Sequence, residues 1–262
     1  MARPDQNFTA TVYHASPAAR VAAPFDPVEA VAVVTAAVAL FLVFASSLSG
    51  PLGIVVAQLV GAAVPLAWAA ARRRSLAALG FGRPRLAPLA GAVLLGATFW
   101  YVNLQIARPL LDHFGRGELP SLERTVLAGD SSLMRLLAFA LVPAVCEELL
   151  MRGVLARSLV PIGPRVAVVA SALAFALFHL SAVRFAPTLL LGLVLATLAV
   201  RTGTIWASIV THLLNNAMAL LVSDGTLQPL ANLIDRHPDA ALAVAAVGSL
   251  AGIALGARSS AS

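Results

Sequence analysis

Long apolar runs are the feature that most constrains how this chain can fold. Eight segments consist mostly of apolar residues and are separated by short polar or proline-containing stretches. A helix needs about 20 such residues to cross the hydrocarbon core of a bilayer. The candidate spans are residues 28–49, 51–71, 86–107, 133–160, 165–183, 186–200, 204–222 and 240–257. The sequence therefore predicts an all-α, polytopic transmembrane helical bundle of about eight spans, in which the 186–200 span is short.

The low charge content supports a membrane protein. Only 11% of the residues are charged and 60% are hydrophobic, whereas an average soluble domain has about 25% charged residues. The net charge of +6 reflects 18 arginines against 12 acidic residues, since the chain has no lysine. Because these arginines lie mostly between apolar runs, membrane topology explains them and we expect no nucleic-acid partner. The single cysteine, Cys146, excludes an internal disulfide and a multi-cysteine zinc site.

The distribution of arginine predicts the orientation. With the N-terminus in the cytoplasm, 11 of the 18 arginines lie on the cytoplasmic side, five of them in one short loop, as the positive-inside rule favours. We expect a multi-pass protein of a bacterial plasma membrane with both termini cytoplasmic. The predicted parts are an N-terminal tail (1–27), a transmembrane helical domain (28–257) and a C-terminal tail (258–262). The polar connection at 108–132 is predicted as a solvated loop or a short interfacial helix.

Three charged residues interrupt the fourth apolar run: Glu147, Glu148 and Arg152. A charge near the bilayer centre costs at least about 2.5–3.5 kcal/mol, so such residues need a partner or a function. Neighbours on a helix point about 100° apart, and the two glutamates therefore serve different roles. Glu148 and Arg152 are four residues apart and can form an ion pair. This pairing leaves Glu147 as a candidate general base or ligand; the alternative is that both glutamates reach water at a helix end.

Two further runs contain buried polar candidates. His179 lies in the fifth run, while His212 and Asn216 share a helical face in the seventh. Taken singly, a packing histidine or an interhelical hydrogen bond of about 0.6–2 kcal/mol explains them as well. The helical rise brings these residues to similar depths if the fourth helix continues past Arg152 to about Val160. Three neighbouring runs would then present ionisable residues to one membrane-embedded cavity.

The three motifs together resemble those of a known family. Glu147-Glu148-x-x-x-Arg152, Phe175-x-x-x-His179 and His212-x-x-x-Asn216 are similar to the motifs of the CPBP intramembrane proteases. This family includes the type II CAAX prenyl endopeptidases and the abortive-infection (Abi) proteins. The resemblance covers a protease-like core at about residues 125–225.

The resemblance implies an endopeptidase that cleaves a membrane-associated peptide or protein. Glu147 would activate a water, His179 would hold or deprotonate that water, and His212 with Asn216 would stabilise the tetrahedral oxyanion. Glu148 and Arg152 would support these residues, and Phe175 would shape the pocket. Without the family, a glutamate base with histidine and asparagine side chains still supplies the parts that peptide hydrolysis needs.

Metal dependence and two other functions stay open at this level. Glu147, His179 and His212 form a ligand set used by catalytic zinc, but His-Glu-x-x-His is absent and a metal-free mechanism, which we favour slightly, needs no further residues. Buried glutamate and histidine also occur in proton-coupled transporters, and a non-catalytic membrane scaffold is a third interpretation. The expected partners are the substrate and the lipid bilayer; the sequence makes no prediction of the oligomeric state.

Overall fold

The computed structural model describes residues 23–114 and 131–257, and all regular elements in these two ranges are helices. This finding confirms the all-α fold class. The predicted N-terminal tail lies outside the described residues except for 23–27, and the predicted C-terminal tail lies entirely outside them.

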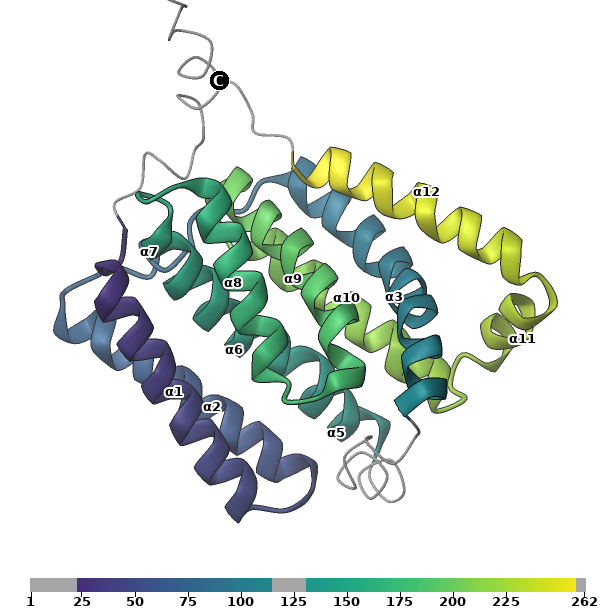
Figure 1. Cartoon of the computed structure of the whole chain (residues 1–262), viewed down its shortest axis with the longest axis horizontal. Coiled ribbons are helices and arrows are strands. Elements are labelled where there is room, and N and C mark those ends of the chain that lie inside the picture. The colour runs from purple at the N-terminus through teal and green to yellow at the C-terminus, as the bar shows by residue number, and fades with distance from the viewer. Residues whose placement is uncertain (1–22, 115–130, 258–262) are drawn as a thin grey trace, which may run out of the picture.

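The helices form one bundle (Figure 1). In chain order they are α1 (Pro27–Ser47), α2 (Gly50–Ala71), α3 (Leu86–Phe114), α5 (Ser132–Leu136), the π-helix η3 (Leu137–Leu141), α6 (Val142–Glu148), the π-helix η4 (Leu149–Ala156), α7 (Arg157–Leu159), α8 (Pro164–Phe178), α9 (Ala182–Thr202), α10 (Trp206–Ser223), α11 (Gln228–Arg236) and α12 (Pro238–Gly256). Each of the eight predicted spans corresponds to one helix or, for the fourth, to the run from α5 to α7.

Six of the described helices are long and apolar enough to cross a membrane: α1, α2, α3, α9, α10 and α12. The fourth predicted span runs without a break from Ser132 to Leu159 but alternates between α and π geometry. The fifth, α8, has only 15 residues. The chain is therefore a polytopic membrane bundle whose centre contains one irregular helical run and one short helix.

Helix ends differ from the prediction at three places. The sixth span is not short: Ser181 Oγ accepts from Arg184 N and starts α9 at Ala182, so this helix has 21 residues. The fifth ends at Phe178, five residues before the predicted end. The predicted interfacial segment around Leu110 belongs to the last turns of α3, because Pro109 lies inside that helix without ending it. Of the predicted 108–132 loop, residues 115–130 lie outside the described part of the chain.

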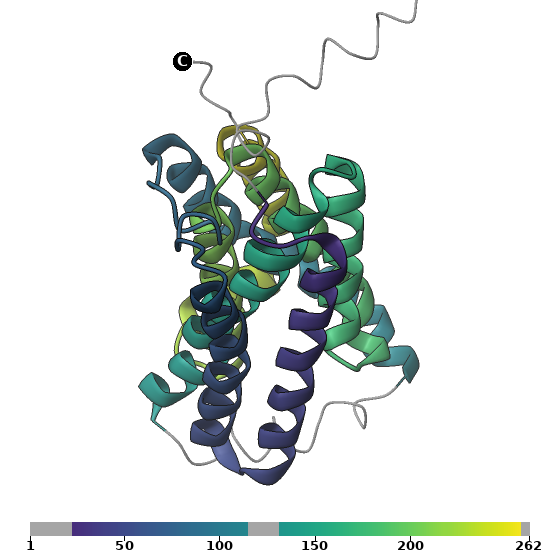
Figure 2. The ribbon, with the colours of Figure 1, turned by 90° about the vertical axis from the view of Figure 1, so that its left-hand side faces the viewer.

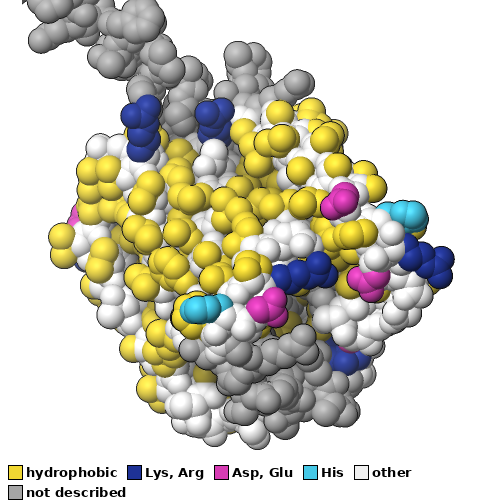
Figure 3. Space-filling model, turned by 45° about the vertical axis from the view of Figure 1, so that its right-hand side comes forward, with side chains coloured by type: hydrophobic (Ala, Val, Ile, Leu, Met, Phe, Trp, Pro, Cys, Tyr) yellow, Lys and Arg dark blue, Asp and Glu magenta, His cyan; other side chains and the backbone are white. Residues whose placement is uncertain are grey.

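The surface matches a lipid environment. Large apolar side chains are exposed along α1 and α12, among them Val31, Val43, Val244, Val247 and Leu250. Figure 3 shows a face on which hydrophobic side chains form a broad band with charged side chains at its borders. The beginning of α1 and the end of α12 lie at the same end of the bundle (Figure 1).

Two helix pairs flank the centre of the bundle. α1 and α2 run antiparallel to each other (Figure 2), and α2 packs on α6. On the other flank, α12 lies against α3, and the small residues Gly248, Gly252 and Gly256 recur every four positions along it. A Cβ at Gly252 would lie 2.7 Å from Leu95 N of α3, so the close approach of these helices requires glycine, as in small-xxx-small membrane contacts.

Candidate active site

The run from α5 to α7 contains Glu147, Glu148 and Arg152, and two of its carbonyl groups accept hydrogen bonds from side chains of other helices. Pro143 has no N–H to donate to the Phe139 carbonyl, four residues earlier in η3. That carbonyl accepts instead from Asn216 Nδ2 of α10, at 3.1 Å. In η4, the Met151 carbonyl accepts from Ser171 Oγ of α8, at 2.8 Å. Both π segments thus offer carbonyl groups to neighbouring helices, and π-bulges occur often at functional sites.

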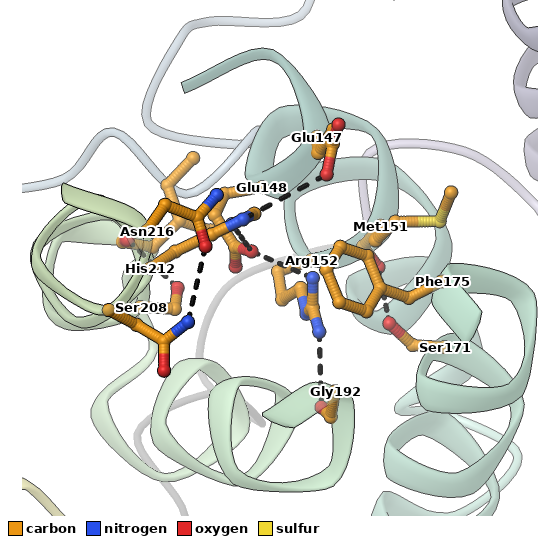
Figure 4. A network of polar contacts seen from close by, with 12 residues as sticks. Glu147, Glu148, Met151, Arg152, Ser171, Phe175, Gly192, Ser208, His212 and Asn216 are labelled. Carbon is orange, nitrogen blue, oxygen red and sulfur yellow. Dashed lines mark hydrogen bonds and ion pairs between the residues drawn. The ribbon is translucent and has the colours of Figure 1, made fainter. Parts of the chain in front are cut away.

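Glu148 and Arg152 form the ion pair that their spacing predicted. Arg152 Nη1 lies 2.7 Å from Glu148 Oε1, and neither side chain is exposed. Arg152 Nη2 also donates to the Gly192 carbonyl of α9, at 3.1 Å. The guanidinium carbon stands 4.5 Å from the ring centroid of Phe175. These contacts, drawn in Figure 4, tie three helical segments together, so Glu148 does not reach water at a helix end.

His212 joins this ion pair. Its Nδ1 lies 3.0 Å from Glu148 Oε1, the same oxygen that accepts from Arg152. The imidazole is 2% exposed and meets the Phe175 ring edge-on at 5.5 Å. A carboxylate on one ring nitrogen sets the orientation of a histidine and leaves its second nitrogen for another partner.

Glu147 lies on the other side of His212. Its Oε2 is 3.9 Å from His212 Nε2 and has no hydrogen-bond partner among the described residues. Its Oε1 accepts from Gln58 Nε2 of α2, at 2.7 Å. The carboxylate, 5% exposed, is therefore held at one oxygen while the other oxygen faces His212.

His179 follows the last residue of α8 and lies against the same aromatic side chain. Its Nδ1 is 2.8 Å from the Phe175 carbonyl; since a carbonyl only accepts, Nδ1 is the donor. In the neutral ring Nε2 then carries the lone pair. The Phe175 and His179 rings are 4.9 Å apart. The next residue, Leu180, has a φ of +47°, a conformation that is uncommon for residues other than glycine, and here it turns the chain sharply after the histidine.

Asn216 does not share a hydrogen-bond partner with His212, although their spacing predicted a common target. The two residues share a face of α10, but Asn216 contacts Phe139 and accepts from Asn215 Nδ2, while His212 contacts Glu148. One N–H of the Asn216 amide is engaged by Phe139, and the second is available to another acceptor.

The structure thus gathers most of the predicted residues around Phe175 and His212. The sequence patterns did not indicate Gln58, the π segments or the contact between Glu148 and His212. A signal for Gln58 exists, because it is the only amide or ionisable side chain between Gly50 and Ala71. The contact with His212 depends on how α6 and α10 pack, and short motifs carry no information on that.

The predicted zinc ligands do not form a metal site in this arrangement. Among residues 23–114 and 131–257, no group of three or more His, Cys, Asp and Glu side chains could hold a metal ion. His179 uses Nδ1 for the Phe175 carbonyl, and His212 uses Nδ1 for Glu148. In both rings this leaves Nε2 for another partner, as in metal-binding histidines, but the described part of the chain does not bring Glu147, His179 and His212 together into a group that could hold an ion, and the mechanism we propose uses no metal.

Two apolar pockets lie in the bundle. One of about 270 Å³ is bounded by α1 and α8 and includes Met151 and Phe178, the sequence neighbours of Arg152 and His179. The other, of about 360 Å³, lies among α3, α10, α11 and α12. The catalytic candidates line neither pocket, but the first borders the site.

The fold and the buried Glu–His–Arg network define a polytopic membrane protein with a polar centre enclosed by its helices. Residues 129–218 match the family model described as Type II CAAX prenyl endopeptidase Rce1-like. This stretch is about a third of the chain and contains all three motifs, so the match confirms the predicted resemblance to the CPBP and CAAX membrane proteases. Comparisons with curated proteins and with solved structures returned no match.

Proposed function

We propose that this protein hydrolyses a peptide bond of a membrane-associated peptide or protein within the bilayer, with Glu147 as the general base. The observation that carries the proposal is the pair of facing atoms, Glu147 Oε2 and His212 Nε2, 3.9 Å apart in a buried site. The other polar atom of each side chain is hydrogen-bonded, Glu147 Oε1 to Gln58 and His212 Nδ1 to Glu148. Preorganised polar groups of this kind suit acid–base catalysis.

The chemistry follows from these hydrogen bonds. Because Nδ1 of neutral His212 donates to Glu148, its Nε2 presents a lone pair towards Glu147. A water placed at these two atoms donates one O–H to each and directs an oxygen lone pair at the substrate. As the water oxygen bonds to the peptide carbonyl carbon, Glu147 takes its proton and the carbonyl oxygen becomes an oxyanion. Glu147 then returns the proton to the nitrogen as the C–N bond breaks, which yields a carboxyl group and an amine.

The other site residues have separate roles in this proposal. The second N–H of Asn216 donates to the oxyanion, and one such donor is typically worth about 2.7–4 kcal/mol. His179 helps to hold the water through its Nε2. Glu148 and Arg152 orient His212, and Phe175 excludes water from their ion pair. His212 thus orients the water rather than stabilising the oxyanion, since its Nδ1 proton is directed at Glu148.

The surroundings favour a substrate that is itself in the membrane. The pocket between α1 and α8 borders the site and is lined mostly by apolar side chains, such as those of Val34, Leu42 and Leu177. A peptide segment with apolar side chains or an attached lipid fits such a lining better than a soluble peptide does. The family match to prenyl endopeptidases makes a lipidated C-terminal peptide one candidate.

The test compares membranes from cells that make the wild-type protein with membranes that contain Glu147→Gln. This substitution keeps the shape of the side chain and removes the base, so cleavage should fall by about 10²-fold or more. Peptides with new termini are identified by mass spectrometry and confirmed with purified protein in lipid vesicles. Asp235→Asn, the same chemical change at an exposed residue, should leave cleavage unchanged. Equal cleavage by wild type and Glu147→Gln would exclude the proposed role.

A further inference from the structure

We infer that Gln58 is a positioning residue, which holds the Glu147 carboxylate in its reactive orientation; this inference rests on the proposed function. Gln58 belongs to α2, outside the residues that match the family model. Its side chain is 5% exposed, and its Nε2 donates to Glu147 Oε1 at 2.7 Å. The site therefore includes a contribution from a helix to which neither the motifs nor the family match assigns a function.

The composition of α2 makes this contact specific. Every other residue between Gly50 and Trp68 is apolar or glycine. An amide in such a helix is unfavourable in lipid unless it finds a partner. The partner of Gln58 is the carboxylate of Glu147. Arg152 pairs with Glu148, so Glu147 has no cation at hydrogen-bond distance among the described residues. Gln58 thus engages a catalytic candidate rather than the backbone of its own helix.

The geometry shows how Gln58 acts through Glu147. A carboxylate on a glutamate side chain can rotate, and the terminal torsion of glutamate is broad. With Oε1 held by Gln58, the other oxygen, Oε2, is directed towards His212 Nε2. Loss of the donor frees this rotation and spreads Oε2 over positions from which it does not reach the water. Misplacement of a catalytic group by about 1 Å can cost about 100-fold in rate.

A purely structural role has a different signature. An interhelical hydrogen bond in a membrane contributes about 0.6–2 kcal/mol to stability, and Gln58 would be no more than such a contact if its loss affected folding alone. Thr98 and Ser249 form a matched contact between α3 and α12, at 3.1 Å, and Ser249 is also 5% exposed. Ser249→Ala is therefore the control for the loss of one buried interhelical hydrogen bond.

The experiment measures cleavage and the infrared spectrum of purified protein in lipid vesicles. The probe for cleavage is the peptide identified from the membrane comparison above. Gln58→Met removes the donor at nearly constant volume and should lower kcat about tenfold to a hundredfold with KM unchanged. Gln58→Asn, whose amide is one methylene shorter, should behave in the same way and serves if Gln58→Met does not fold. Ser249→Ala should leave kcat unchanged.

The infrared arm does not depend on proteolysis. The carboxyl band of Glu147 is identified as the band lost in Glu147→Gln, and it should shift in both Gln58 variants but not in Ser249→Ala. If the wild type cleaves no peptide, the proposed function fails, and positioning with it, whatever the spectrum shows. If the wild type cleaves and either Gln58 variant keeps wild-type kcat, positioning alone is overturned. An unshifted band overturns it as well.

Discussion

Replacement of Arg152 by methionine should destabilise the protein far more than a typical substitution does. The Arg152 guanidinium is fully buried, pairs with Glu148 at 2.7 Å, donates to the Gly192 carbonyl and faces the Phe175 ring. Methionine fills much of the same volume but has no charge and no donor. Glu148 would then keep only His212 as a hydrogen-bond donor. The carboxylate would be left without its cation in a site that has no exposure to water.

The magnitude follows from this burial. Removal of one partner from a buried ion pair costs about 3–5 kcal/mol, because the remaining charge is desolvated and unpaired. Glu148→Gln should cost a similar amount, since it leaves the guanidinium of Arg152 behind. The double variant contains neither charge. It should therefore lose less than the sum of the two single losses, with a coupling energy near the upper end of the usual 0.5–3 kcal/mol range.

The measurement is the free energy of unfolding in detergent micelles, from titration with a denaturing detergent, for wild type, both single variants and the double variant. Arg201→Met is the control, because Arg201 is exposed in the last turn of α9, and it should change the unfolding free energy by no more than about 0.5 kcal/mol. Additive losses in the double variant, or a loss below about 1 kcal/mol for Arg152→Met, would show that the pair does not hold this site together.

Three further predictions concern other parts of the chain. Gly252→Leu should separate α12 from α3, since even a Cβ at this position meets Leu95 N at 2.7 Å, and a fall in thermal stability that Ala251→Leu does not share would report it. Burial alone would raise the pKa of Asp224, but hydrogen bonds from Thr226 and the charge of Arg135 lower it overall. The Arg135–Asp224 contact should therefore stabilise the protein above the usual carboxyl pKa of about 3.9 and lose its effect as the pH falls through the lower folded value; a melting-temperature deficit in Asp224→Asn that did not close at acid pH would contradict this. Cleavage should survive chelation, and loss of activity that zinc restores would refute the metal-free mechanism.

The sequence predicted the fold class because the physical signal is local. Apolar runs of near-span length and the near absence of charge each constrain a segment without reference to its neighbours. The same holds for the ion pair of Glu148 with Arg152, which depends only on a four-residue spacing along one helix. The continuation of this helix to Leu159 was likewise predictable, since Pro161 marks where it can end.

Other features were not accessible from spacing. The end of α8 at Phe178 and the start of α9 at Ala182 depend on a cap and on a residue with positive φ. The π segments shift hydrogen bonds by one residue, and no periodicity reports them. Pro143 is an exception, because the sequence alone shows that this residue has no N–H to donate to the Phe139 carbonyl. In the structure that carbonyl accepts from Asn216.

By itself, the sequence determined that this chain is a helical membrane protein and which residues are costly enough in lipid to require a function. Only the tertiary structure decided which of them meet: Gln58 with Glu147, Glu148 with His212, and Asn216 with Phe139. The physical reason is that a charge is costly wherever it lies in hydrocarbon, whereas a hydrogen bond needs two atoms within about 3 Å. Residues as far apart in the chain as Gln58 and Glu147 reach that distance only when their helices pack.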